Sequence, residues 1–323
     1  MNYKDSGVDL HEQEVFNAKL ANKMPWIGGF AGAFDIGEDY LVSSTNGVGT
    51  KVMLYNDYKD TPGVSIANLG IDLVAMVLND LVCTGVKPLF FNDYLAVNDL
   101  TKMDAMKLIN GINTGLSLCG DIPLIAGDTA IMGDMYGEGQ FDVAGFAVGA
   151  IPKDNFIDGT AIKDGDVMLG LESSGFHSNG YTLIRKVLET VPKEDISDDL
   201  IKDLLKPTKI YVKSVLHTLR KHKKTVHAIS HITGAGRANV NRLLGEDVNL
   251  RPVWHDAEPT NETFDFIKKH GDIDEFEFRK VFNNGIGMVF IVDRSDAYEI
   301  QRTLESIGEK VFEVGSIATR VKS

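Results

Sequence analysis

Two successive series of strand-like runs and helical patterns, separated by a turn-rich passage, most constrain the fold of this 323-residue chain. A chain of this length is typical of two domains rather than one. In the first series, apolar strand-like runs alternate with helical patterns at residues 64–85 and 102–118. The strand candidates are residues 40–44, 89–97, 123–126 and 141–151. This order predicts a mixed α and β architecture.

The turn-rich passage lies at residues 151–166 and is dense in proline, glycine and aspartate, as is typical of a connection between folded units. We therefore divide the chain into a domain of residues 1–150 and a domain of residues 151–323. The second series has strand candidates at 167–171, 226–232 and 287–292, and helical patterns at 180–189, 210–219 and after Gly236. We predict an α+β fold for this part as well.

Charge and composition exclude several classes of protein. The formal net charge of −13 argues against a general nucleic-acid-binding surface, which needs lysine and arginine to neutralise phosphates. A short basic run at 220–224 is typical of a solvated face, with a local binding patch as the alternative. Cys83 and Cys119 lack metal or redox spacing, which predicts no disulfide and a cytoplasmic setting. The first ten residues have no apolar signal core, and no window approaches a membrane span of about 20 apolar residues.

One carboxylate lies on the apolar side of the first predicted helix. Winding residues 65–82 at about 100° per residue gathers the apolar side chains on one wide arc, and Asp80 falls within it. An ionised carboxylate on a packed face is costly unless it is paired, hydrogen-bonded or bound to a cation, so we predict a function for Asp80. Capping or pairing with a basic side chain is the alternative. The narrow opposite wedge, an ordinary polar helix face, consists of Asn68, Asp72 and Asn79.

Four glycine-rich segments place polar groups beside predicted strands, and two of them lie in the first domain. Residues 44–51 offer backbone N–H groups, hydroxyls and an ammonium, which suits phosphate binding. The Walker A spacing is absent, so an ordinary glycine turn remains the alternative. The second segment contains Asp128, a candidate partner of Asp80 for Mg²⁺, which takes one or two carboxylates in nucleotide sites. A turn or cap role is the alternative for Asp128.

The other two segments lie in the second domain. Residues 173–180 (Ser-Ser-Gly-Phe-His-Ser-Asn-Gly) precede a predicted helix, whose positive end would attract an anion and favour a neutral His177. Alternatively, Ser178 only caps the helix and His177 is a satisfied surface residue. Residues 231–236 nearly match a dinucleotide fingerprint, but Asn239 stands where its last glycine belongs. A small-anion or substrate-lining turn is the better prediction there.

Taken together, these segments resemble the ordered signatures of the aminoimidazole ribonucleotide synthetase family. Residues 3–9 (Tyr-Lys-Asp-Ser-Gly-Val-Asp), 46–51 (Asn-Gly-Val-Gly-Thr-Lys), 173–180 and 282–288 (Phe-Asn-Asn-Gly-Ile-Gly-Met) occur in that order. Further similar segments are residues 70–76, 79–81, 88–91, 136–137, 142–146 and 210–214. The similarity covers almost the whole chain, and chance does not account for a match of this extent.

The resemblance implies a homodimer whose N-terminal sheets join into a shared barrel, flanked by α+β C-terminal domains, with the nucleotide near the interface. It implies that ATP and magnesium, often with potassium, close the imidazole ring of formylglycinamidine ribonucleotide to give 5-aminoimidazole ribonucleotide, ADP and phosphate. ATP would phosphorylate the formyl oxygen, and the amidine nitrogen would attack that carbon and expel phosphate. Such chemistry needs charge neutralisation and positioning more than a protein nucleophile.

The resemblance also implies roles for individual residues. The residues expected to contact ATP and its phosphates are Lys4, Asn46, Gly47, Gly49, Thr50, Lys51 and Thr129. The expected metal ligands are Asp80 and Asp128. The residues expected to line the substrate are Ser174, Gly175, Ser178, Thr233 and Gly234. The expected catalytic residues are Asp80, His177 and Asn179, with His177 as the best candidate for proton transfer.

Several positions depart from the family pattern. Asn46 stands where the family usually has Asp, Asp128 replaces Glu, and Ile131 replaces an acidic residue. Arg237 and Asn284 also replace the usual Phe and Cys of their motifs. Two alternatives therefore stay open: another ATP-using relative, such as selenophosphate synthetase or thiamin-phosphate kinase, and a non-catalytic nucleotide-binding regulator. Neither cysteine lies near the N-terminus, where the selenium enzyme's reactive residue is expected, which favours the purine enzyme.

Overall fold

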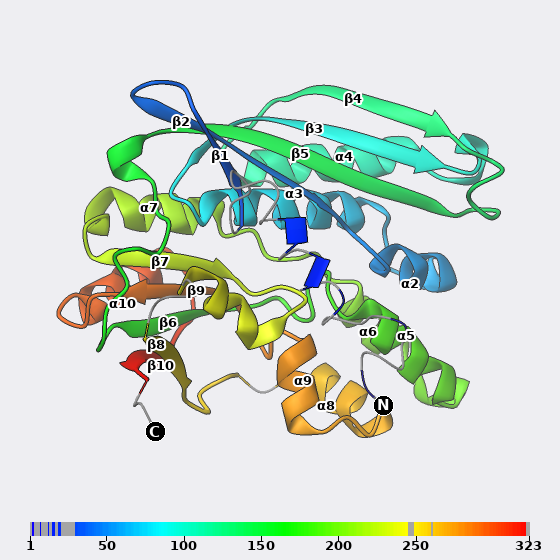
Figure 1. The fold of residues 1–323 in the computed structure, drawn as a ribbon. Coiled ribbons are helices and arrows are strands. Elements are labelled where there is room, and N and C mark those ends of the chain that lie inside the picture. The colour runs from blue at the N-terminus through cyan, green and yellow to red at the C-terminus, as the bar shows by residue number, and fades with distance from the viewer. Residues whose placement is uncertain are drawn as a thin grey trace.

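The computed structural model describes residues 30–244, 249–259 and 261–320, together with residues 2, 7, 12, 15, 16, 19 and 20. Lys4, predicted to contact ATP, lies outside the described residues. The described chain forms two α+β units, each built on a five-stranded sheet (Figure 1). The predicted mixed α+β class is confirmed. No helix in the described part of the chain is both long and apolar enough to cross a bilayer.

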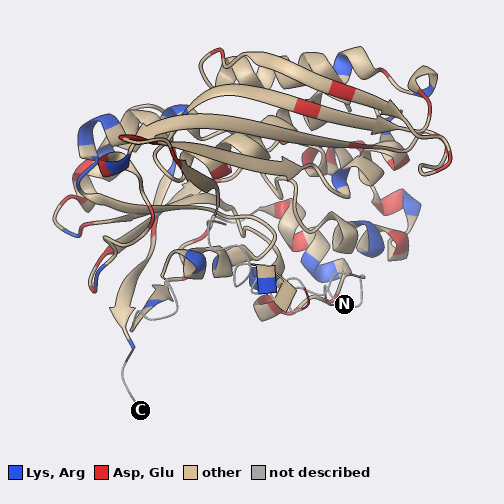
Figure 2. Cartoon of the chain, turned by 45° about the horizontal axis from the view of Figure 1, so that its top comes forward, with Lys and Arg blue, Asp and Glu red and all other residues tan. Residues whose placement is uncertain are grey.

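The first sheet has the strand order β1-β2-β5-β3-β4. Its strands are β1 (Gly32–Asp35), β2 (Asp39–Gly47), β3 (Lys87–Val97), β4 (Leu124–Ile131) and β5 (Phe141–Pro152). Only the β3–β4 pair of this sheet is parallel. Helices α3 (Ala67–Val82) and α4 (Ala105–Leu118) cover one face, and α2 (Lys51–Tyr58) follows β2 (Figure 1). The opposite face carries no described helix and few charged residues (Figure 2).

Helices α3 and α4 approach each other closely because each presents a glycine to the other's backbone. A Cβ atom added to Gly111 of α4 would lie 2.0 Å from the Ala67 carbonyl oxygen. A Cβ atom added to Gly70 of α3 would lie 2.4 Å from the Leu108 carbonyl oxygen. No side chain fits at either position without separating the helices. The crossing therefore fixes α3 against the sheet and, through α3, the position of Asp80.

The second sheet is antiparallel throughout, with the strand order β7-β9-β6-β10-β8. Its strands are β6 (Val167–Glu172), β7 (Val226–His231), β8 (Leu250–Trp254), β9 (Ile286–Val292) and β10 (Val311–Thr319). The helices of the second unit are α5 (Tyr181–Thr190), α6 (Asp198–Leu204), α7 (Val212–His222), α8 (Glu262–His270), α9 (Glu275–Val281) and α10 (Ala297–Glu305). Short 3₁₀ turns lie at Leu100–Lys102, Lys153–Asn155 and Lys193–Asp195.

The helix predicted after Gly236 is a 3₁₀ helix, Gly236–Leu243. Its first turn is tightened by Asn239, whose side-chain amide donates to the carbonyl oxygens of Gly236 at 2.8 Å and Thr233 at 3.3 Å. A side chain that bonds to the preceding backbone competes with the i→i−4 ladder of an α-helix. The same residue therefore removes the dinucleotide fingerprint and shapes the turn that replaces it.

The polar wedge of α3 forms one of the contacts between the two units. The expectation that this wedge is an ordinary polar face is wrong, since Asp72 and Asn79 are both 0% exposed. Its three side chains bond to residues 205–211 of the second unit. These bonds are Asn68 Nδ2 to Leu205 O (3.2 Å), Thr208 N and Oγ1 to Asp72 Oδ1 (both 2.6 Å), Asn79 Nδ2 to Lys209 O (2.9 Å) and Tyr211 N to Asn79 Oδ1 (2.9 Å).

We expect Gly111→Ala to destabilise the protein because the new methyl group would collide with the α3 backbone. Overpacking of this kind typically lowers the free energy of unfolding by about 1–3 kcal/mol. Gly32→Ala is the matched control, because a Cβ atom there meets nothing within 4 Å and φ is not positive. Urea unfolding measures both variants. Equal effects of the two substitutions would contradict the close helix crossing.

Candidate functional site

Asp80 lies where the two units meet, between β2 and β7. Its Oδ1 atom lies 2.7 Å from His231 Nδ1, and its Oδ2 atom accepts a hydrogen bond from Asn46 Nδ2 at 3.1 Å. The exposed fraction is 8% for Asp80 and 0% for His231. Asp80 lies on the buried apolar side of α3. Burial of its carboxylate is tolerated because polar side chains at the ends of two strands bond to it. Pairing, which the sequence left as an alternative, is therefore realised.

The carboxylate of Asp80 still fits a cation. Each carboxylate oxygen has two lone pairs, and the two observed partners occupy one on each. Asn46 is neutral and orients the carboxylate without neutralising its charge. An aspartate that is oriented by neighbours and retains free lone pairs has the donor chemistry that Mg²⁺ prefers.

Asp128 does not lie beside Asp80 within this chain. The strand registers place Asn46, Gly145, Asp93 and Gly127 in one row across β2, β5, β3 and β4. Three strand spacings put the backbone of Asn46 roughly 14 Å from that of Gly127. Strand alternation turns Asp128 to the sheet face opposite its neighbour Gly127. Joint binding of one cation by Asp80 and Asp128 is thus not supported by the single chain.

Asp93 is a candidate functional residue that the sequence analysis missed. It shares the sheet face of Asn46 and lies two strands away, and a Cβ atom added to Gly127 would be 2.3 Å from its Oδ1 atom. Partial burial raises the pKa of the Asp93 carboxyl. An acidic residue inside the apolar run 89–97 was the signal that could have identified it. Asp93, rather than Asp128, is the carboxylate on the face of the sheet that Asp80 contacts.

The glycine segment after β2 contains a fully enclosed ammonium group. Lys51 Nζ lies 3.0 and 2.9 Å from the two carboxylate oxygens of Asp72, and it donates to the carbonyl oxygens of His177 at 2.8 Å and Lys206 at 2.5 Å. Lys51 is 0% exposed, and this burial lowers its pKa. Three acceptors use all three ammonium protons. This arrangement does not support the predicted phosphate contact by Lys51.

The neighbouring residues of this segment remain accessible. Gly49 and Thr50 are exposed at the start of α2, and Gly49 has a φ of +69°. The hydroxyls of Thr50 and Thr182 lie 3.0 Å apart, so the segment touches α5. Gly47 ends β2 directly beside Asn46, whose Oδ1 accepts from the Gly47 N–H at 2.9 Å. Thr129, the other predicted ATP contact, is exposed on the edge strand β4.

His177 is buried, so the alternative of a surface histidine is wrong. It is 2% exposed and has a φ of +61°. Burial holds its pKa well below the usual value, and the electrostatic influence of the neighbouring His231, Lys51 and Lys209 acts in the same direction. Its Nε2 atom accepts from the Ser174 N–H at 3.2 Å, which places the ring proton on Nδ1. Nδ1 is buried without a partner among the described residues, so this N–H is free to donate.

The position of the His177 ring depends on a glycine in β9. A Cβ atom added to Gly287 would lie 2.4 Å from His177 Cε1 and 2.2 Å from the Tyr211 hydroxyl oxygen. Tyr211 in turn donates to the carbonyl oxygen of Glu172 at 2.8 Å. The absence of a side chain at Gly287 therefore gives the imidazole its space.

The predicted substrate-lining residues lie in two adjacent loops, 173–180 and 231–236. Asn179 Oδ1 would be 3.1 Å from a Cβ atom on Gly234, which shows how closely the loops approach. Ser178 does not cap α5, because its hydroxyl pairs with that of Thr208 at 2.8 Å and Gly180 is the N-cap residue. The other predicted substrate-lining residues form hydrogen bonds within the protein. Ser174 Oγ donates to Pro207 O at 2.6 Å, and Thr233 Oγ1 donates to Asn239 Oδ1 at 3.1 Å. The carbonyl oxygen of Gly175 accepts from Asn283 Nδ2 at 2.8 Å.

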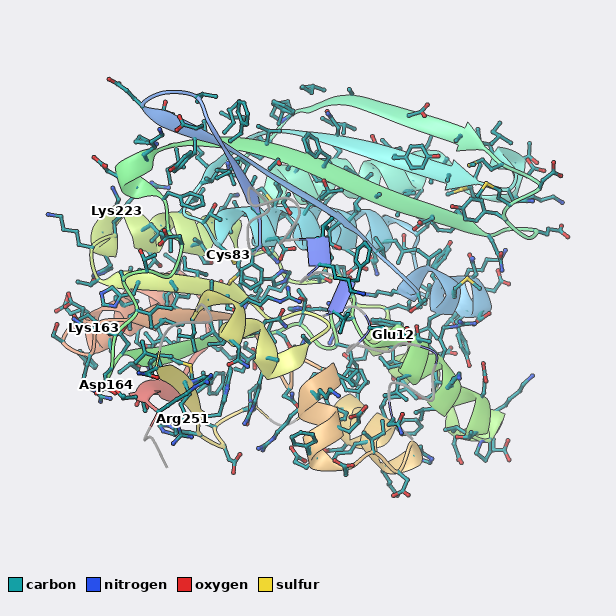
Figure 3. The ribbon with its side chains drawn as sticks, viewed as in Figure 1. Glu12, Cys83, Lys163, Asp164, Lys223 and Arg251 are labelled. Atoms are coloured by element: carbon teal, nitrogen blue, oxygen red, sulfur yellow. The ribbon has the colours of Figure 1, made fainter. Side chains whose placement is uncertain are left out.

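A second cluster of ionisable residues, Asp166, His227 and Asp293, lies elsewhere in the second unit. His227 Nδ1 is 2.7 Å from Asp166 Oδ2, which also accepts from the Lys163 N–H at 2.9 Å. The ammonium of Lys163, at the outer edge of this unit in Figure 3, forms an ion pair with Asp293. Lys163 already supplies a positive charge to the Asp293 carboxylate of this cluster.

Sequence models of two domains match the chain. The N-terminal domain of the AIR synthase related proteins matches residues 28–151, and the C-terminal domain matches residues 163–322. The chain belongs to the AIR synthase related family.

Curated members of this family match over almost the entire chain. The phosphoribosylformylglycinamidine cyclo-ligase of Polaromonas sp. (strain JS666) is 41% identical, covering 99% of this chain and 95% of that protein. The enzyme of that name from Clostridium kluyveri is 40% identical, with coverages of 99% and 98%. The one from Thermoanaerobacter sp. (strain X514) is 42% identical, with coverages of 98% and 97%.

Solved structures of low sequence identity share the fold. A chain of a HypE–HypF complex has a TM-score of 0.67 at 14% identity, covering 94% of this chain and 93% of that one. AaThiL complexed with AMPPCP and TMP has a TM-score of 0.64 at 13% identity, with coverages of 96% and 94%. T. maritima PurL complexed with ATP has a TM-score of 0.64 at 16% identity, and this chain spans 45% of its length.

We expect Asp72→Ala to lower the free energy of unfolding by about 3–5 kcal/mol, because it leaves the buried Lys51 charge without its counter-ion. Asp57→Ala is the control, since Asp57 pairs with Arg185 at 3.3 Å and its side chain is 50% exposed. Removing such a surface pair changes stability by about 0–1 kcal/mol. Guanidinium unfolding compares the two variants. A loss in Asp72→Ala no larger than in Asp57→Ala would contradict the importance of this pair.

Proposed function

We propose that this protein is a phosphoribosylformylglycinamidine cyclo-ligase, which uses ATP to close the ring of formylglycinamidine ribonucleotide and releases ADP and phosphate. The observation that carries the proposal is about 40% identity to cyclo-ligases over nearly the full length. The convergence of loops 173–180 and 231–236 with Asp80, Asn46 and His231 at one interface supports it. The product would be 5-aminoimidazole ribonucleotide.

Nucleotide binding is supported by fold neighbours that were solved with ATP and AMPPCP. We place the phosphates at the exposed backbone of Gly49 and Thr50, where the positive end of α2 carries no side-chain cap and favours an anion. Asp80 would hold Mg²⁺, whose charge would neutralise the phosphate oxygens, with Asp93 as a second carboxylate on the same sheet face. Potassium is a further candidate cation.

His177 is suited to donate a hydrogen bond rather than to carry a charge. The depressed pKa keeps the ring neutral, and the bond from Ser174 N–H to Nε2 fixes the proton on Nδ1. A preorganised N–H in a water-poor site stabilises negative charge that develops on a reacting oxygen. We assign this role to His177 Nδ1–H, with Asn179 beside it as a positioning amide.

The proposed activity is tested by phosphate release with ATP, magnesium and formylglycinamidine ribonucleotide. We expect Asp80→Asn to lower kcat by about 10²–10³, the range found when one electrostatic stabiliser is removed, and His177→Ala to fall in the same range. Asp57→Asn is the control on the surface and should leave the rate unchanged. Absence of substrate-dependent phosphate release from the parent chain with any divalent cation would refute the proposal.

A non-catalytic nucleotide-binding regulator is the second candidate. It is favoured by Asn46, which replaces a carboxylate beside Asp80, and by Ile131, which is 65% exposed on β4. ATP binding without turnover would support this candidate. Restoration of phosphate release by Asn46→Asp would show that the substitution, and not the fold, had removed the activity.

We further propose that two copies pair through the open face of the first sheet, in a cytoplasmic setting that suits two free cysteines. The registers place Phe34, Leu41, Tyr94, Phe146 and Val148 on this face, opposite the helices. Phe34 is 71% exposed and Tyr94 is 41% exposed. An exposed apolar sheet face of this kind marks a protein–protein contact. Closure of two such sheets would also cover the edge strand β4.

Phe34→Asp should convert the dimer to a monomer, because it would bury a charge in the proposed interface. Light scattering after size-exclusion chromatography measures the mass. Phe276→Asp is the matched control, since Phe276 is 80% exposed on α9, away from the sheet. A parent protein that is monomeric at micromolar concentration, or a Phe34→Asp variant that remains dimeric, would contradict the interface.

A further inference from the structure

A hollow of about 510 Å³ lies where the first unit meets α7 and α10. This volume falls in the range of small-molecule sites, roughly 300–1,000 Å³. It shares no lining residue with the site around Asp80. The lining residues are Lys87, Pro88, Cys119, Gly120, Ile122, Lys213, Ser214, Leu216, His217, Arg220 and Ile307. Both units therefore contribute to it, with β3 and the end of α4 on one side and α7 on the other.

The rim of this hollow carries three cations and no carboxylate. Lys87 comes from the first unit, and Lys213 and Arg220 lie two turns apart on α7. Among the described residues, none of the three forms an ion pair. The net charge of the whole chain is −13, so a group of three cations without a carboxylate contrasts with the overall charge of the protein. Clustered, unpaired Lys and Arg side chains create a positive potential that attracts anions.

A buried, unsatisfied nitrogen lies in the same place. His217, between Lys213 and Arg220 on α7, lines the hollow, and its Nε2 atom is buried without a hydrogen-bond partner among the described residues. Buried polar atoms are almost always hydrogen-bonded, so an unpaired one indicates a missing partner. Because this atom is buried, an anionic oxygen bound between the cations would become its acceptor only after the imidazole ring turned toward the hollow.

The floor of the hollow is apolar and chemically unreactive. Pro88, Ile122 and Cys119 are buried in it. Burial raises the pKa of the Cys119 thiol to about 12, although the positive charge of Lys213 acts against this, so the thiol stays protonated and serves as apolar surface. Glu309, the acidic group that bonds to the lining residue Ser214, is already paired with Lys209. The carboxylate beneath the floor is thus compensated and does not oppose an anion.

We propose that this hollow binds a phosphorylated small molecule of nucleotide size. Its phosphate oxygens would lie between Lys87, Lys213 and Arg220, and its apolar or aromatic part would cover Pro88 and Ile122. Because the cations come from both units, the bound anion would link the two sides of their junction. Of the basic run 220–224, only Arg220 lines the hollow, and Lys223 points outward at the end of α7 (Figure 3). The inference does not depend on the proposed ligase activity.

Calorimetric titration of the full chain with inorganic pyrophosphate and with AMP tests this proposal. The double variant Lys213→Ala/Arg220→Ala should bind both probes at least 10-fold more weakly than the parent chain. Lys223→Ala/Lys224→Ala is the matched control. It also removes two positive charges from this region, but neither residue lines the hollow. It should leave both affinities unchanged. The conservative pair Lys213→Arg/Arg220→Lys should retain binding, and thermal unfolding confirms that each variant is folded.

Four outcomes would overturn the proposal. The first is no binding of either probe to the parent chain at millimolar concentration. The second is unchanged affinity in Lys213→Ala/Arg220→Ala, which would assign the binding to another site, such as the proposed ATP site. The third is equal weakening in the lining and control variants, which would indicate a general charge effect. The fourth is loss of AMP binding with retained pyrophosphate binding in Lys213→Ala/Arg220→Ala, since both probes would share the three cations.

Discussion

The buried ion pair between Lys51 and Asp72 is the interaction on which the arrangement of the site depends. Two charges removed from water are costly, and they are tolerated only when further hydrogen bonds satisfy the remaining protons and lone pairs. Carbonyl oxygens of His177 and Lys206 complete the ammonium of Lys51. Thr208 donates two hydrogen bonds to Asp72 Oδ1, whereas Asp72 Oδ2 is held by its ion pair with Lys51. The pair thereby joins the β2–α2 segment, α3 and the loop that carries His177.

This geometry separates two kinds of polar residue at the interface. Lys51, Asp72 and Asn79 have all their main partners inside the protein and act as structural connections. His177 Nδ1 has no described partner, and Asp80 retains lone pairs on both oxygens. The unsatisfied groups are the ones that a substrate or cation would complete. The distinction follows from hydrogen-bond inventory and burial, which differ strongly between residues of similar charge.

Local patterns in the sequence were sufficient to predict the positions of many strands and helices. Strands β2, β3 and β5 and helices α3 and α4 have continuous apolar runs or a clear helical period, and they appear close to the predicted positions. Asp80 was identified because it violates the helical pattern. Asp72 obeys that pattern, so nothing local showed that its partner would be a buried lysine 21 residues away. Whether a polar wedge faces water or a polar backbone segment is decided by tertiary contacts, which periodicity does not contain.

Residue type alone also led to the unsupported prediction that Lys51 contacts phosphate. A lysine after a glycine-rich turn has the composition of a phosphate loop, but composition does not reveal which acceptors surround the ammonium. Similarly, the separation of Asp80 from Asp128 depends on the order β2-β5-β3-β4, and strand order is not encoded in any single segment. Motifs that carry chemistry were found by residue type, whereas their grouping into a site required the sheet registers.

The Lys51 contacts also bear on the way the chain is made. The acceptors of its ammonium lie 126 and 155 residues further along the sequence, in His177 and Lys206. Domains generally fold as they leave the ribosome, N-terminal part first. When the first sheet has emerged, Asp72 is present, but the carbonyl groups and Thr208 that complete the pair are not yet synthesised. Until the second half has been synthesised, the first half therefore exposes a partly solvated Lys51 at its surface. The second half then encloses this side chain.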